Sequence, residues 1–297
     1  MGEFVGIDPR GAHELIRRME AGKAFLGRTR PSLDAAIAEA GPDWAGHQGS
    51  TAVRRAWAFF HESQQDLRWR VDTAEQLVPV RERGLLTADF PFGSESEARQ
   101  DAEDTAAAVR AALDDPRALA RALSAAVGKA GDPAYAAALL AALGPETFTG
   151  ALRLLTGAPL GEADAAPLAR AFAGAERTGR LGDEWHALAE TAPAEVLTAL
   201  VSLAGPSGTF LGRVALALLD RPGPVGDLGG LVAAFAANPV AFQEFLAGHP
   251  GQAATLLTAA AGDPGLDAAL RAALEPGAGA EGLRERARAT VRRIGGG

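Results

Sequence analysis

Cysteine is absent from the 297 residues of the chain. Its absence excludes disulfide bonds, thiolate zinc sites, iron–sulfur clusters and cysteine nucleophiles. Long apolar runs are missing too: no uncharged apolar stretch reaches the roughly 18 residues that a membrane-spanning helix needs, so we expect no stable membrane insertion. The N-terminus lacks the cationic segment and apolar run of a cleaved signal peptide. We therefore expect a cytoplasmic protein, or one secreted without such a peptide.

Positive charge is in the minority, because 29 Lys and Arg face 37 Asp and Glu, for a net charge of −8. Nucleic-acid binders draw affinity from neutralising phosphates, so we expect no nucleic-acid partner. The C-terminal segment 283–294 combines five arginines with apolar residues and predicts a basic amphipathic helix. Our interpretation is that these arginines complement the helix dipole and the acidic remainder of the chain; the alternatives are an acidic partner, a lipid headgroup or nucleic acid.

Motifs that carry catalysis are also lacking. His61-Glu62 opens the His-Glu-x-x-His zinc pattern, but Gln65 stands where the second histidine is needed. The glycine-rich segments lack the Lys-Ser/Thr of a phosphate-binding loop, and no Gly-x-Ser-x-Gly sequence is present. The acidic residues between Glu95 and Asp104 are typical of the solvated first turns of a helix. We predict that the chain is not an enzyme and has no catalytic, metal-binding or cofactor-binding residues and no cofactor.

The residues that are present predict an all-α fold. Apolar residues make up 47% and charged residues 22% of the chain, as in ordinary globular proteins. No alternating Val/Ile/Thr/Tyr pattern is found, so we expect no sheet. In residues 1–80, small and apolar residues recur at spacings of three and four in two runs, 12–40 and 53–78. This spacing predicts two long helices, each with one apolar face for packing against another helix.

The two predicted helices are joined by residues 41–49, which are rich in turn formers. A short connection requires the helices to fold back as an antiparallel hairpin. Asp8 is placed to cap the first helix and Pro9 suits its first position. Pro31, inside that helix, predicts a bend near Thr29 and Arg30.

The turn contains Trp44-Ala45-Gly46. With two helices of nearly equal length on either side, the segment resembles the WXG family, the helical-hairpin substrates of ESX (type VII) secretion. Trp44 is able to cover the ends of both helices and Gly46 to take the backbone turn. The family's export signal, a Tyr followed four residues later by an acidic residue, is missing, because Tyr135 is the one tyrosine and Leu139 stands in the acidic position.

A two-helix hairpin has too little core to bury both apolar faces. Some of these residues must therefore meet another WXG-type hairpin, in a homo- or heterodimer, or the chain's own C-terminal bundle. The predicted protein-binding residues are Trp44, Gly46, Leu15, Met19, Leu26, Val53, Phe60 and Leu67.

The rest of the chain predicts a linker over 81–95 and a multi-helix bundle over 96–297. Short Ala/Leu-rich segments follow one another, and many begin at an X-Pro pair such as Asp115-Pro116 or Asn238-Pro239. Two segments about 105 residues apart, starting at Asp132-Pro133 and Asn238-Pro239, suggest two related halves, although Ala/Leu-rich helices resemble one another in any case. The region is similar to those that follow WXG-type heads in actinobacterial polymorphic toxins.

The function hypothesis is a non-enzymatic WXG-like protein of a type VII secretion or polymorphic toxin system, acting as a delivery, trunk or partner-binding module. The alternative is a cytoplasmic all-helical scaffold or adaptor unrelated to secretion.

Overall fold

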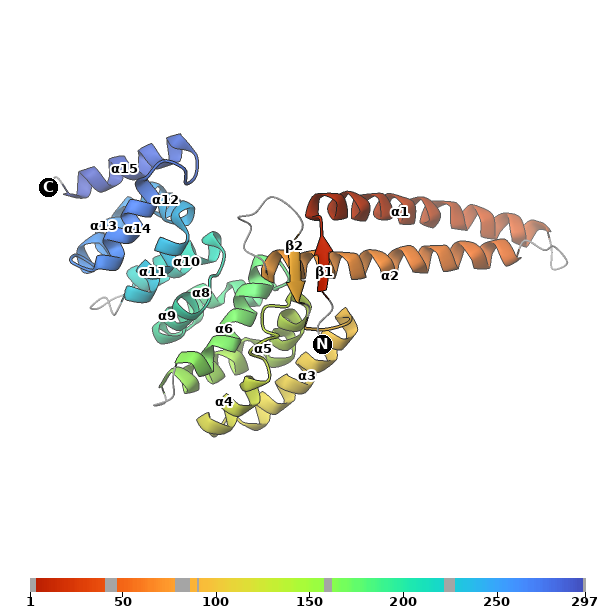
Figure 1. Cartoon of the computed structure of the whole chain (residues 1–297), viewed down its shortest axis with the longest axis horizontal. Helices are drawn as coiled ribbons and strands as arrows, with labels where there is room; N and C mark the ends of the chain where they lie inside the picture. The colour runs from red at the N-terminus through yellow and green to blue at the C-terminus, as the bar shows by residue number, and fades with distance from the viewer. Residues whose placement is uncertain are drawn as a thin grey trace. The chain divides into compact units, whose positions relative to one another are not determined.

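The structure is a computed structural model, and it describes residues 4–40, 47–77, 86–89, 91–157, 162–221 and 228–295 (Figure 1). The predicted all-α class is confirmed. The chain divides into two compact units: the first comprises Met1–Ala98 and Asp132–Ala134, and the second Arg99–Gly131 and Tyr135–Gly297.

The first unit consists mainly of two long helices, α1 (Pro9–Ala40, 32 residues) and α2 (His47–Leu77, 31 residues). They lie side by side and run in opposite directions (Figure 1). The Asp8 carboxylate accepts hydrogen bonds from the backbone N–H groups of Arg10 (3.1 Å) and Gly11 (3.2 Å), which caps α1 as predicted. Helix α1 continues past Pro31, which lies inside it.

Two short strands, β1 (Phe4–Ile7) and β2 (Leu86–Asp89), pair antiparallel, with Phe4 opposite Asp89 and Ile7 opposite Leu86. The prediction that no sheet forms is wrong for these two segments, and β2 lies inside the range 81–95 that we predicted as a linker. Each strand has four residues, too few to show an alternating pattern. The ladder depends on pairing between segments about 80 residues apart, which local periodicity cannot reveal.

A buried carboxylate accepts three hydrogen bonds in the first unit. Asp132 Oδ2 accepts hydrogen bonds from Trp69 Nε1 and Thr73 Oγ1, both at 3.0 Å, and Asp132 Oδ1 accepts from the Ala134 N–H at 2.9 Å. The three side chains, Trp69, Thr73 and Asp132, are fully buried. A carboxylate in such a place is stable only with this kind of compensation, since water no longer solvates it.

The second unit is a series of helices. They are α3 (Glu95–Ala111, whose first residues belong to the first unit), α4 (Pro116–Ser124), α5 (Pro133–Gly157), α6 (Glu162–Arg177), α7 (Asp183–His186), α8 (Leu188–Thr191), α9 (Ala194–Leu203), α10 (Gly208–Leu219), α11 (Gly229–Ala237), α12 (Pro239–Gly248), α13 (Pro250–Ala259), α14 (Pro264–Leu274) and α15 (Glu281–Gly295).

The X-Pro pairs mark helix starts as the sequence predicts. Helices α4, α5, α12, α13 and α14 each begin at the proline of such a pair. In α5 the pair Gly144-Pro145 produces an internal break, because Gly144 has φ 73° and ψ 159°. That positive φ suits glycine, and proline then restarts the helix. At Ala192-Pro193 the proline is the N-cap, one residue before α9.

Most helices of the second unit fall into two rows of neighbours (Figure 1). One row runs through α4, α6, α9, α11 and α14, each in contact with the next, and the other through α8, α10, α12 and α15. Helices α9, α11 and α14 begin at Ala194, Gly229 and Pro264, which are 35 residues apart. A period of this length is typical of stacked helix pairs in solenoid proteins. The offset of about 105 residues noted in the sequence equals three such steps.

Aromatic rings lie in the core of the stack among buried Leu, Val and Ala side chains. Phe172 on α6 lies with ring centroids 5.7 Å from Phe148, 6.3 Å from Trp185 and 4.8 Å from Phe210. A second group joins Phe235 to Phe242 and Phe245 across α11 and α12. No single described helix is long and apolar enough to cross a membrane; α11 and α12, bent by 113°, reach the required length and composition only as a pair.

Tyr135, the one tyrosine, is buried in the second unit and donates a hydrogen bond to Thr105 Oγ1 at 3.0 Å. Burial raises the pKa of its hydroxyl to about 12, the Thr105 hydrogen bond lowers it, and the Asp101 charge raises it. Because the folded pKa lies above the unfolded value of about 10, the stabilisation is present below pH 10 and is lost as pH rises from about 10 to 12.

We therefore expect the tyrosinate absorbance of the folded chain to appear near pH 12, and that of the urea-unfolded chain near pH 10. Since no other tyrosine contributes, a spectrophotometric titration reports on this residue alone. Titration of the folded chain near pH 10 would contradict the buried placement of Tyr135.

Candidate partner-binding surface

The contact between α1 and α2 has one polar edge. His13 Nε2 lies 3.1 Å from Glu75 Oε1, Lys23 Nζ donates to Gln64 Oε1 at 2.9 Å, and Ser50 Oγ donates to Asp34 Oδ1 at 2.6 Å. The hydrogen bond from Ser50 lowers the pKa of the Asp34 carboxyl below its usual range. The three pairs advance along α1 while they go back along α2, which fixes the antiparallel register.

Of the buried residues of α1, only Met19 belongs to the predicted apolar face. Ile16 and Ile37 are each 5% exposed and Met19 is 9% exposed, whereas Leu15 is 49% exposed. The predicted face contained Met19 but neither isoleucine, and Leu15 of that face is largely exposed, so the prediction matches the buried side of α1 only in part. Residues 12–40 carry two adjacent apolar stripes, and periodicity alone does not say which one faces α2.

The opposite edge of the contact is apolar and open. A Cβ at Gly22 would lie 3.9 Å from the Phe60 ring, so Gly22 and Phe60 meet across the two helices. Residues seven apart share a helix stripe. Leu15 therefore lies on the same edge as Gly22, and Val53 and Leu67 lie on the same edge as Phe60.

The side chains of this edge keep part of their surface in solvent. Leu26, Val53, Phe60 and Leu67 are half-buried, and Leu15 is exposed. Phe25, 61% exposed, and Phe59, 65% exposed, add large apolar surface on the same two helices. We call this surface the open face: Leu15, Phe25, Leu26, Val53, Phe59, Phe60 and Leu67. Of the six predicted helix residues, Met19 alone is buried.

Trp44 and Gly46 lie outside the described residues. Nothing in the sequence pattern singled out Phe25 or Phe59, because neither follows the three-and-four spacing of the predicted faces. Which aromatic side chains are exposed can be read only from the tertiary structure.

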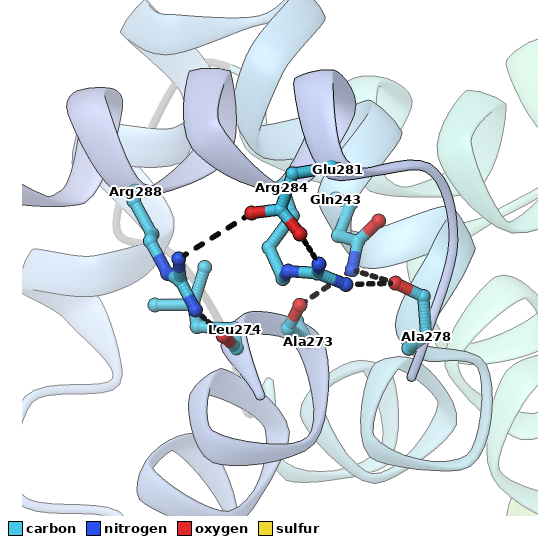
Figure 2. A network of polar contacts seen from close by, with 7 residues as sticks. All are labelled: Gln243, Ala273, Leu274, Ala278, Glu281, Arg284 and Arg288. Carbon is cyan, nitrogen blue, oxygen red and sulfur yellow. Dashed lines mark hydrogen bonds and ion pairs between the residues drawn. The ribbon is translucent and has the colours of Figure 1, made fainter. Parts of the chain in front are cut away.

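The basic C-terminal helix, α15, is held by a polar network (Figure 2). Arg284 is 5% exposed, pairs with Glu281 and donates to the Ala278 carbonyl oxygen at 3.0 Å. Arg288 donates to the Leu274 carbonyl oxygen and lies 3.8 Å from Glu281. These arginines thus serve contacts within the chain, whereas Arg286, Arg292 and Arg293 are exposed.

Gln243 completes this network from α12. Its amide nitrogen donates to the carbonyl oxygens of Ala273 at 2.5 Å and Ala278 at 3.0 Å. Figure 2 shows the amide nitrogen and Arg284 converging on Ala278. The carbonyl oxygens at the end of α14 have no partner within their own helix, so these side chains satisfy them and position α15.

Within the described residues, no three His, Asp or Glu side chains converge to hold a metal ion. No family model matches the chain, and no curated protein or solved structure is significantly similar to it.

Proposed function

We propose that the chain is a non-enzymatic partner-binding protein whose open face packs against a second helical hairpin. The observation that carries the proposal is the half-buried row on α2, Val53, Phe60 and Leu67, beside exposed Leu15 and Phe25 on α1. Adjacent apolar side chains of this size are ordinarily covered in a stable protein, and large exposed apolar patches mark interaction sites. A second pair of antiparallel helices covers such a face in a four-helix bundle.

We further propose that this pairing serves a type VII secretion or polymorphic toxin system, with the chain as a delivery or trunk module. The support is the pair of long antiparallel helices, of 32 and 31 residues, on either side of Trp44-Ala45-Gly46. Tyr135 is buried against Thr105, and it therefore does not supply an exposed export signal. On this proposal a partner hairpin supplies that signal.

The second candidate is an all-helical scaffold or adaptor unrelated to secretion. The two stacked rows of helices in the second unit favour it, because arrays of helix pairs commonly present binding surfaces along their length.

The test measures the mass of the full chain in solution, alone and mixed with any WXG-type protein found to be encoded beside its gene, for wild type and for Leu15→Glu/Phe25→Glu. Both side chains are exposed, so the charges leave the helices folded but oppose burial against a partner. We expect wild type to form a complex, with itself or with that protein, and the variant to weaken it at least tenfold.

Val127→Glu is the matched control, since Val127 on the second unit is 54% exposed. It should assemble like wild type. A wild-type chain that stays monomeric in both samples would contradict the pairing, and so would an open-face variant that assembles as tightly as Val127→Glu. If the chain associates with itself but does not bind the WXG-type protein, the result would favour the second candidate, a scaffold or adaptor unrelated to secretion.

A further inference from the structure

A hollow of about 770 Å³ lies on the second unit, among α6, the segment between α9 and α10, and α11. This volume is within the range of small-molecule sites. Its apolar lining includes Leu203, Leu211 and Ala234, and its polar lining includes Arg170 and Arg177. Apolar walls with a few placed polar groups are typical of sites for small organic ligands.

The two arginines give the hollow a local positive charge on an acidic chain. Arg170 and Arg177 are seven residues apart on α6, so they share one face of that helix at a separation of two turns, about 10 Å. Arg177 donates to the Gly205 carbonyl oxygen. Although the residue keeps much of its surface exposed, partial desolvation of the guanidinium lowers its pKa, and the Glu176 charge opposes this shift.

The carboxylate of Glu176, next to Arg177 in the chain, is engaged in hydrogen bonds with Ser207. Glu176, 8% exposed, accepts hydrogen bonds from the Ser207 N–H at 2.8 Å and from Ser207 Oγ at 2.5 Å. It therefore organises the segment before α10. Asn238, also in the lining, accepts from the Ala241 N–H through Oδ1 at 3.3 Å, which leaves its amide N–H groups as donors.

We propose that this hollow binds a small organic anion, whose carboxylate or phosphate lies between Arg170 and Arg177 and whose apolar body packs on Leu203, Leu211 and Ala234. Guanidinium groups bind both kinds of oxyanion through charge-assisted hydrogen bonds. The apolar walls distinguish such a ligand from a free inorganic anion. The proposal is independent of the open face, which belongs to the first unit.

The experiment is calorimetric titration of the full chain with octanoate, octyl phosphate and inorganic phosphate. We expect at least one octyl compound to bind, and to bind more tightly than inorganic phosphate; the tighter of the two identifies the anion. Arg170→Gln should weaken octyl binding at least tenfold, because it removes the charge of the guanidinium and a charge-assisted hydrogen bond to the anion.

Two further variants test whether binding needs the volume of the hollow and whether it depends on an arginine of the lining in particular. Ala233→Phe places a ring in the hollow from an exposed position of its lining and should abolish octyl binding with the helical circular dichroism unchanged. Arg271→Gln, at an exposed arginine of α14 outside the lining, should bind like wild type. Absence of binding by both octyl compounds would overturn the proposal. So would equal weakening by Arg170→Gln and Arg271→Gln, or normal binding by Ala233→Phe.

Discussion

Asp132→Ala should lower the free energy of unfolding by about 4 kcal/mol, because it leaves three donors without an acceptor. The Trp69 indole N–H and the Thr73 hydroxyl are fully buried, so water does not replace the carboxylate. Each unsatisfied buried donor costs about 1–3 kcal/mol, and the lost cap of α5 costs about 1 kcal/mol more. Urea unfolding followed by circular dichroism measures the change.

Asp115→Ala provides the matched control. Asp115 also precedes a proline and caps a helix, accepting from the Arg117 N–H at 2.9 Å, but it is exposed. Its replacement should cost about 1 kcal/mol, the ordinary value of a cap. If the two alanine variants lost the same stability, the buried bonds to Trp69 and Thr73 would contribute nothing. In the background of Trp69→Phe, Asp132→Ala should cost less than in wild type, since one of the orphaned donors is already gone.

Phe172→Ala should lower the free energy of unfolding of the second unit by about 3–5 kcal/mol. The side chain is 1% exposed and lies among the rings of Phe148, Trp185 and Phe210. Removing it costs the transfer energy of the ring and leaves a cavity between helices that relax only in part. Chemical denaturation followed by tryptophan fluorescence measures the effect, since Trp185 is in the same cluster.

A graded series tests whether packing is the cause. Phe172→Leu fills most of the space and should cost less than the alanine variant. Val127→Ala, at an exposed position of the same unit, should change stability by no more than about 0.5 kcal/mol. Equal losses for Phe172→Leu and Phe172→Ala would show that the aromatic cluster does not depend on the ring's volume.

The two candidate binding surfaces differ in chemistry, so their tests do not interfere. The open face is apolar and belongs to α1 and α2, where charge substitutions should separate partners. The hollow combines two arginines with apolar walls on the second unit, where Arg170→Gln should weaken an anion. Neither set of variants touches residues of the other surface.

Helix starts could be predicted from the sequence because their causes are local. Proline sets φ and lacks an N–H group at positions where a helix leaves that group unpaired, so Pro116, Pro239 and Pro264 each begin a helix. The Gly144-Pro145 break has the same origin. The all-α class followed from helical periodicity throughout and from the absence of long alternating runs.

Only the tertiary structure determines which apolar stripe of a helix is buried and which is exposed. Leu15 and Ile16 are neighbours in sequence and similar in hydrophobicity, but Ile16 is buried and Leu15 is exposed. A helix with two adjacent apolar stripes is consistent with either face packing inward, and only the register set by pairs such as Lys23 with Gln64 selects one. The same selection leaves the other stripe partly exposed to solvent.

Contacts between distant segments could not be predicted from the sequence either, because local patterns do not show which segments meet. The pairing of β1 with β2, and the bonds from Trp69 and Thr73 to Asp132, join residues about 60 to 80 positions apart that carry no shared local pattern. Local chemistry determined where the helices of this chain begin and which faces are apolar. The tertiary structure decided which of those faces are buried, because burial depends on what the rest of the chain brings against them.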